Sequence, residues 1–552
     1  MPARPSRVLI SRLPVRLLVA VLSGLATGLA FEPVAWSPLV VIGVAGLTVA
    51  VTGLRGRRAA LVGLGYGVAF MGVLLPWIQV IGVDAWIGLS LLQAAFYAVL
   101  GALLARVMGL PGWPVWAATV WVAVDVARSY VPWGGFPWGR LAFATVDTPL
   151  AAAMTWVSTS GTTFLIALLG STLAWALMTV LDTPGRAAVG VAAAVAVGAA
   201  PVLGSSVTPV EEHTEVVGEA RVAAVQGNVP GEGMDAFAER RAVLNNHVSA
   251  TRELAARIES GQTPRPDFVL WPENSTDIDP FRDSTVYADI QSAVDAVGVP
   301  TLVGAMVGGE QPMDVYNQGI VWLPGSGPED SYSKTHPVPF GEYIPHRAQL
   351  ARLFARLDQI PRDMVPGSEP GLLDLGGTTV GDVICFEVAY DGVVRDVAEL
   401  DPRLLVVQTN NATYMGTGQV EQQFAISRLR AIETGRHVVT VATNGISGIV
   451  APDGSVVERA TPRETVVMEA DLPLRAGLTP AVRFGRLVES ALLLLAAAAL
   501  LVAGVRDVRR RERRPTAPTD TADPPPAADR GSGREGAPQP DETSLPTSGA
   551  PR

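Results

Sequence analysis

The chain has 552 residues, of which 49% are hydrophobic and only 17% are charged, and its mean hydropathy is +0.31. Such an apolar composition is unusual for a soluble protein and indicates membrane-spanning segments. The formal net charge of −10 argues against a nucleic-acid partner. The single cysteine excludes an internal disulfide and a cysteine-based metal cluster, and the five histidines lack metal-binding spacing. We therefore expect no metal and no other cofactor.

Seven hydrophobic segments occupy the first 205 residues, and an eighth follows much later in the chain. Each is close to the ~20 residues that a helix needs to cross a ~30 Å hydrocarbon core. The sequence therefore predicts a membrane α-helical bundle of eight spans. The segments are residues 13–31, 37–54, 59–76, 86–105, 112–128, 158–181, 187–205 and 487–505.

Arginine is distributed unevenly over the loops between these segments. It occurs at 55–58, 106 and 186, after segments two, four and six, whereas loops 32–36 and 77–85 contain neither Arg nor Lys. Because positively charged loops remain in the cytoplasm, the N-terminus is predicted inside and the chain beyond the seventh segment outside.

Residues 206–485 change in character, since short apolar runs alternate with polar, helix-like stretches. This pattern is typical of a soluble α/β domain. We expect strands near 221–228, 267–275, 299–307, 317–323, 379–387, 404–411, 437–444 and 465–469, and helices at 236–259, 283–297 and 420–435. The predicted domains are a seven-span membrane domain at 1–205, an extracytoplasmic α/β domain at 206–485, the eighth transmembrane helix at 486–505, and a cytoplasmic tail at 506–552 that is basic and then Pro-rich and disordered.

Three residues of the α/β domain are candidates for chemistry. Cys385 is the only cysteine and follows an apolar run, and Lys334 is the only lysine in a chain whose other fixed cations are arginines. A compact amine at one position suggests a reacting centre, because Arg and Lys are not equivalent there. Glu273 follows the apolar run Phe268–Trp271. Each residue also has a purely structural interpretation. Cys385 could be a small buried hydrophobic residue, Lys334 could result from neutral sequence drift, and Glu273 could cap a helix.

Together the three side chains could perform acyl transfer. A thiol with a pKa near ~8.5 needs a base at neutral pH, and a partly desolvated carboxylate such as Glu273 can serve. The tetrahedral intermediate carries an oxyanion that an ammonium such as Lys334 can stabilise.

The motifs around these residues resemble a known superfamily. Trp271-Pro272-Glu273-Asn274, then the run 332–345 with the pattern YxKxHxVPFGEYIP, then Ile384-Cys385-Phe386-Glu387 are similar, in this order, to the nitrilase superfamily. Eight spans around such a domain resemble the bacterial apolipoprotein N-acyltransferase family, and so do Val124–Arg128 and Gly134–Trp138 in the membrane half.

The resemblance implies an αββα sandwich for the α/β domain and a role for each motif residue. Phe386 and Tyr414 stand where the family often has Tyr and Trp. The implied roles are general base for Glu273, oxyanion donor for Lys334, nucleophile for Cys385, and support for Glu342, Glu387, Asn411 and Tyr414.

The implied enzyme is an acyltransferase of the bacterial plasma membrane. It would move an acyl chain from a membrane phospholipid, through a Cys thioester, to the α-amine of the N-terminal diacylglyceryl-cysteine of a lipoprotein. The expected partners are the phospholipid donor, the diacylated apolipoprotein and the bilayer, and the expected state is a monomer. The alternatives are a membrane-tethered nitrilase-type amidase, which would need at most one anchor, and a transporter or receptor, which would need more ionisable residues in its spans.

Two features of the membrane half have open interpretations. Asp125 and Arg128 lie at helical i,i+3 spacing, and the structural interpretation is that they neutralise each other. The Gly134–Trp138 turn could anchor an interfacial loop or form part of a lipid access path.

A reporter at residue 260 is expected outside the cytoplasm and one at residue 530 inside it. The arginine-bearing loops are expected in the cytoplasm, and this sets the orientation of all eight helices. Reporter fusions or accessibility labelling at the two positions would measure this. Finding both on the same side of the membrane would contradict a bundle of eight spans.

Overall fold

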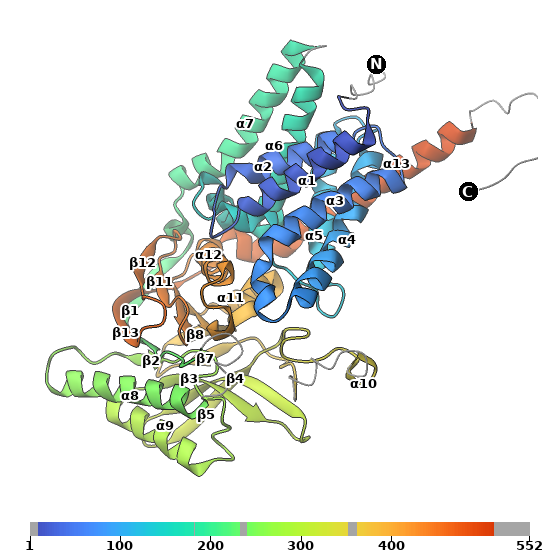
Figure 1. Cartoon of the computed structure of the whole chain (residues 1–552). Helices are drawn as coiled ribbons and strands as arrows, with labels where there is room; N and C mark the ends of the chain where they lie inside the picture. Colours follow the sequence, from blue (N-terminus) through green and yellow to red (C-terminus); the bar gives the residue numbers. More distant parts are fainter. Residues whose placement is uncertain (1–8, 181–182, 232–239, 351–361, 513–552) are drawn as a thin grey trace, which may run out of the picture. The chain divides into compact units, whose positions relative to one another are not determined.

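The computed structural model describes residues 9–180, 183–231, 240–350 and 362–512. The chain divides into two units, Met1–Val505 and Arg506–Arg552. The first contains both the apolar helices and the α/β domain (Figure 1). The predicted disordered tail beyond residue 512 and the first residues of the helix predicted at 236–259 lie outside the described residues.

All eight predicted hydrophobic segments are helical. Among the described helices, five are long and apolar enough to cross a membrane, namely α3, α4, α6, α7 and α13, and α1 and α2 are shorter apolar helices. Their bounds are α1 (Leu13–Leu29), α2 (Pro38–Val51), α3 (Arg57–Leu74), α4 (Val83–Val107), α5 (Trp113–Tyr130), α6 (Ala153–Thr179), α7 (Pro184–Val207) and α13 (Pro480–Glu512).

Small residues let two of these helices approach each other closely. A Cβ atom added at Gly63 of α3 would lie 2.1 Å from the backbone oxygen of Tyr97, and one added at Gly101 of α4 would lie 2.5 Å from that of Ala59. Only glycine fits these contacts, as is common where helices pack in a membrane.

The α/β domain contains two sheets. The first has the order β13-β1-β2-β3-β4-β5, with β6 beside β4, and the second has the order β12-β11-β10-β9-β8-β7. The first sheet is built from β1 (Glu215–Gln226), β2 (Phe268–Leu270), β3 (Thr301–Gly308), β4 (Asp314–Leu323), β5 (Gly327–Ser333), β6 (Asp363–Met364) and β13 (Val466–Ala476). The second is built from β7 (Leu372–Asp374), β8 (Thr379–Ile384), β9 (Leu404–Thr409), β10 (Val438–Ala442), β11 (Gly448–Val450) and β12 (Val456–Arg459).

Alternating side chains along the strands build four layers. In β1, Val222 and Ala224 join the core between the sheets, whereas Ala223 and Val225 join a core with α8 (Arg240–Glu259) and α9 (Ser284–Val297). Successive side chains of a strand point to opposite faces of its sheet, so this strand has an apolar core on each face. The predicted αββα sandwich is confirmed.

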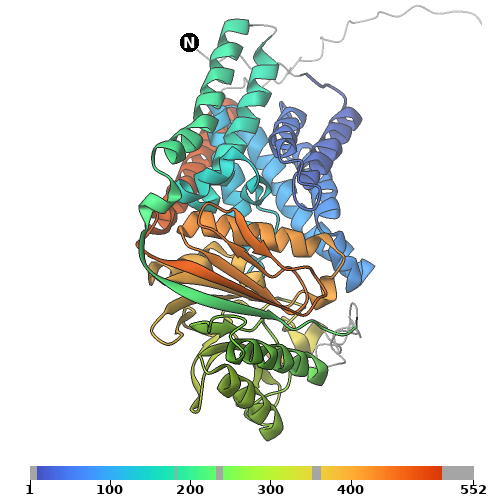
Figure 2. The same ribbon diagram turned by 90° about the vertical axis from the view of Figure 1, so that its left-hand side faces the viewer.

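The fourth layer consists of α11 (Asp391–Glu399) and α12 (Gly418–Thr434), and it has two covered faces. Leu405 and Val407 of β9 belong to the same apolar core as α11, α12 and helices α1–α6. Figure 2 shows α12 between the second sheet and the apolar helices. The second sheet therefore faces the membrane helices through this helical layer.

The structure differs from the predicted elements in one strand end and in several elements that were not predicted, among them α11, β5, β6, β7, β11 and β12. The strand predicted at 379–387 ends at Ile384, and a 3-10 turn, η7 (Cys385–Ala389), follows. The edge strand β5 was missed because most of its residues are polar, and backbone pairing with β4 holds it.

Candidate active site

Cys385 lies where β8 ends and η7 begins, and its side chain is half-buried. Its φ angle is +54°, in the left-handed region that a residue with a Cβ atom seldom adopts. Such backbone strain costs of order 1–3 kcal/mol and persists only where neighbouring contacts impose it.

Glu273 follows β2 in the first sheet, and both of its carboxylate oxygens are held. The amide of Asn317 on β4 donates to Oε1 at 2.7 Å, and the backbone N–H of Asn410, just after β9, donates to Oε2 at 2.8 Å. The side chain is 4% exposed. The carboxylate is therefore fixed from both sheets at once.

Lys334 follows β5 and is 1% exposed. Its Nζ lies 3.1 Å from Oε1 of Glu273 and 2.6 Å from Oε1 of Glu342. Burial alone would lower the pKa of Lys334, but the two carboxylates raise it well above its usual range. Burial raises the pKa of Glu342, although Lys334 opposes this. The ammonium thus remains charged between a base candidate and a second carboxyl group.

The electrostatic surroundings keep the thiol protonated at rest. Burial and the charge of Glu273 raise the pKa of Cys385 to about 12, while Lys334 and a hydrogen bond from Thr409 lower it. Thr409 Oγ1 donates to Sγ at 3.3 Å. Because little thiolate exists at neutral pH, a nucleophilic role for Cys385 would require a base.

Glu387 does not join the Lys334 cluster. Its carboxylate is fully buried and accepts hydrogen bonds from Tyr332 Oη, the backbone and hydroxyl of Thr335, and the backbone N–H groups of His336 and Ile384, at 2.7 to 3.0 Å. The Glu387 carboxylate therefore links the segment after Lys334 to the end of β8 before Cys385, and it holds these two segments together.

Asn411 supports the sulfur indirectly. Its amide donates to Gln419 at 3.0 Å and to Gln423 at 2.9 Å, and Gln423 donates to Thr409 at 2.8 Å and lies 3.8 Å from Cys385 Sγ. Sequence analysis missed Thr409 and Gln423. The available signal was the group of glutamines in α12, which are polar residues at buried positions.

Aromatic rings from the membrane half complete the site. Phe386 stacks on Trp138 with ring centroids 5.3 Å apart and on Phe136 at 5.5 Å, and Tyr414 meets Trp77 at 5.2 Å. The Gly134–Trp138 turn thus packs on the residue after Cys385, where the Phe386 ring stacks on two aromatic rings.

The family model "Carbon-nitrogen hydrolase" matches residues 221–477, a range that includes Glu273, Lys334 and Cys385, and with the two-sheet, four-layer sandwich it defines the class of this domain. The model "Apolipoprotein N-acyltransferase N-terminal domain" matches residues 23–172. The apolipoprotein N-acyltransferase of Mycolicibacterium smegmatis is 36% identical over 88% of this chain and 85% of its own length. That of Pseudomonas aeruginosa is 28% identical over 85% and 92%. The chain belongs to the apolipoprotein N-acyltransferase family.

The structure is also similar to an amidase from Nesterenkonia sp., with a TM-score of 0.33 and 18% identity, over 46% of this chain and 90% of that one.

Glu273→Gln is expected to move alkylation and acylation of Cys385 in opposite directions. Removing the carboxylate charge lowers the thiol pKa from about 12, so iodoacetamide should react faster at each pH below that value. Acyl-enzyme formation should fall by about 10²-fold or more, because an amide cannot accept the thiol proton. Mass spectrometry of each adduct against time measures both. Glu329→Gln, on exposed β5, is the control, and unchanged acylation in Glu273→Gln would show that Glu273 acts only by its charge.

Lys334→Arg keeps the charge but should lower acyl-enzyme formation by about 10²-fold or more, the scale of losing one oxyanion donor. The planar guanidinium is bulkier than the ammonium that fits between Glu273 and Glu342. The rate of thioester formation measures the effect, with Arg459→Lys at an exposed ion pair as the reverse exchange. A near-normal rate would make Lys334 a structural charge.

Proposed function

We propose that this chain transfers an acyl chain from a membrane phospholipid to the α-amine of a diacylated apolipoprotein, in two steps, with Glu273, Lys334 and Cys385 as its catalytic triad. The observation that carries the proposal is the Lys334 ammonium, held between Glu273 and Glu342 near a turn on which a ring from a loop of the membrane half, Trp138, stacks. A soluble amide would need no such contact with the membrane half, which disfavours the amidase alternative.

In the first step Glu273 takes the Sγ proton while the sulfur attacks the carbonyl carbon of the phospholipid ester. The oxyanion that forms is stabilised by Lys334. When the intermediate collapses, the C–O bond breaks and the leaving alkoxide receives the proton from Glu273. A lysophospholipid departs, and the acyl chain stays on Cys385 as a thioester.

In the second step the lipoprotein α-amine attacks the thioester carbonyl carbon. Glu273 accepts a proton from the amine, the C–S bond breaks, and the thiolate recovers that proton. Release of a thiolate is easier than release of an alkoxide, which favours a thioester over an ester at this position.

The membrane arrangement belongs to the same proposal. Both substrates are embedded in lipid, so the α/β domain at 206–485 works at the outer face of the plasma membrane, held by seven spans before it and one after it. The enzyme acts as a monomer.

Cys385→Ala should form no acyl-enzyme and no product, because the nucleophile is absent. Cys385→Ser should be nearly as inactive, since a carboxylate is too weak a base to ionise a hydroxyl. Incubating each purified full-length variant with phospholipid alone, and then with a diacylated lipopeptide, separates the two steps by mass spectrometry. Acyl transfer by Cys385→Ala would exclude covalent catalysis through this residue.

A further inference from the structure

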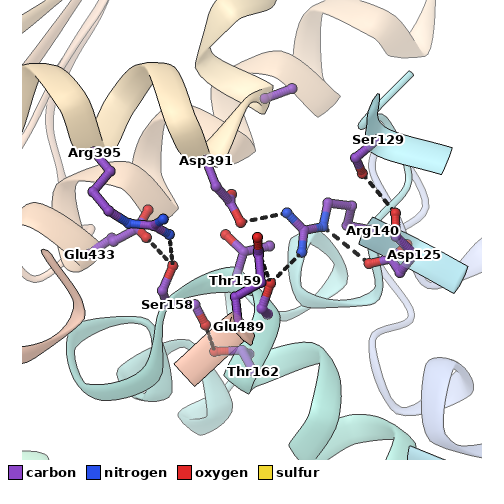
Figure 3. Close-up of polar contacts among 12 residues, drawn as sticks. Asp125, Ser129, Arg140, Ser158, Thr159, Thr162, Asp391, Arg395, Glu433 and Glu489 are labelled. Atoms are coloured by element: carbon purple, nitrogen blue, oxygen red, sulfur yellow. Dashed lines mark hydrogen bonds and ion pairs between the residues drawn. The ribbon is translucent and has the colours of Figure 1, made fainter. Parts of the chain in front are cut away.

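Eight charged side chains, six of which are labelled in Figure 3, form a network where α11 and α12 meet the apolar helices. Four are arginines and four are acids, so their formal charges cancel. All except the half-buried Glu489 are at most 5% exposed. They are Asp125, Arg128, Arg140, Asp391, Arg395, Arg430, Glu433 and Glu489. The pair Asp125–Arg128 expected from sequence, with Oδ1 2.8 Å from Nη2, is one edge of this larger network.

Arg140 is the bridge between the two halves of the molecule. Its Nε lies 3.1 Å from Oδ2 of Asp125, its Nη1 lies 2.5 Å from Oδ2 of Asp391 at the start of α11, and its Nη2 donates to Ser160 at 2.9 Å. One guanidinium thus holds α5, α6 and α11, and a planar fork of this kind fixes direction as well as distance.

The membrane side of the network depends on a break in α6. Ser158 has φ 58° and ψ −171°, which interrupts the helix. Ser158 Oγ donates to Glu433 of α12 at 2.5 Å, Thr159 Oγ1 accepts from Arg430 at 3.1 Å, and Ser160 Oγ donates to Glu489 of α13 at 2.6 Å. Three consecutive hydroxyls therefore face the charges.

The other side of the network reaches the turn that carries the nucleophile. Arg430 Nε donates to the carbonyl of Val388 at 2.8 Å, and its Nη2 donates to the carbonyl of Ala389 at 3.1 Å and to Oδ1 of Asp391 at 2.8 Å. These carbonyls belong to η7, whose first residue is Cys385. The strained backbone of Cys385 requires such outside restraint.

Asp391 is charged within this network. Burial alone would raise its pKa, but Arg140 and Arg430 lower it well below its usual range. Desolvating charges is costly, so buried ion pairs are weak evidence for stability and are better explained by the geometry they impose.

We propose that Asp391 and Arg430 are positioning residues for Cys385: with Arg140 they anchor η7 to the membrane helices and hold the sulfur toward Glu273 and Lys334. The inference rests on the proposed function only in taking Cys385 as the nucleophile. A displacement of about 1 Å at a reacting atom can cost about 10²-fold in rate, so loss of this anchor should be visible in acylation.

The test compares Asp391→Asn with the double variant Asp391→Asn/Arg140→Gln in the full-length chain in phospholipid nanodiscs. The single variant removes one of the four acids, which leaves an excess positive charge in the buried network even though Arg140 keeps Asp125 and Arg430 keeps Glu433. It should therefore lower both the melting temperature and the rate of acyl-enzyme formation. The double variant removes one charge of each sign, so we expect it to recover the melting temperature while acylation stays about 10²-fold slow. Recovery of both together would overturn the proposal, because a merely structural network affects rate only through folding.

The control is Asp396→Asn on the same helix, which removes an exposed pair with Arg486 and should leave both readouts unchanged. Alkylation of Cys385 by iodoacetamide needs no lipid and keeps the two proposals distinguishable. Release of η7 exposes the thiol, so the double variant should be alkylated at least several-fold faster at neutral pH than the unsubstituted chain. An unchanged alkylation rate in the double variant would contradict the anchoring role of Asp391 and Arg430. Absence of an acyl adduct in every variant and in the unsubstituted chain would instead contradict the proposed function, and the alkylation rates would still test the anchor.

Discussion

The layer formed by α11 and α12 is buried on two sides, and both parts of the molecule depend on it. One face covers the second sheet and the other contacts the apolar helices. A helix in this position cannot leave its polar groups unpaired, because an unsatisfied buried group costs about 1–3 kcal/mol. In α12, Gln423 binds Thr409 beside the sulfur and Arg430 binds Asp391 in the ion network. The same helix therefore supports the surroundings of Cys385 and the contact with the membrane helices.

The short turn after Cys385 is held from three directions. Phe386 stacks on Trp138 of the membrane half, and Glu387 accepts hydrogen bonds from the segment after Lys334. The carbonyls of Val388 and Ala389 accept from Arg430. Consecutive residues thus join Cys385 to the membrane half, the first sheet and α12. This convergence gives a physical reason for the unusual backbone conformation at position 385.

The electrostatics of the site separate the resting state from the reaction. Lys334 is stabilised in its charged form by two carboxylates, whereas burial and Glu273 keep the Cys385 thiol neutral. An ammonium that stays charged is available when an oxyanion develops, and a neutral thiol avoids reaction with other electrophiles. In the mechanism that we propose, proton removal is coupled to attack on the bound carbonyl group, as expected for general-base catalysis.

The sequence by itself determined the apolar segments, the α/β character of residues 206–485 and the motif residues, because helix length, strand period and local motifs are properties of neighbouring residues. The αββα layering was implied by the family resemblance of those motifs. The singleton Lys334 and Cys385 could be selected without a structure, although the roles assigned to them remain predictions. Only the tertiary structure decided that Thr409 and Gln423 lie beside the sulfur and that the Glu387 carboxylate accepts hydrogen bonds from backbone N–H groups. It also decided that Asp125 belongs to an ion network that reaches Asp391 through Arg140. These contacts join residues far apart in the chain, and no local pattern records which polar side chains packing will bring together.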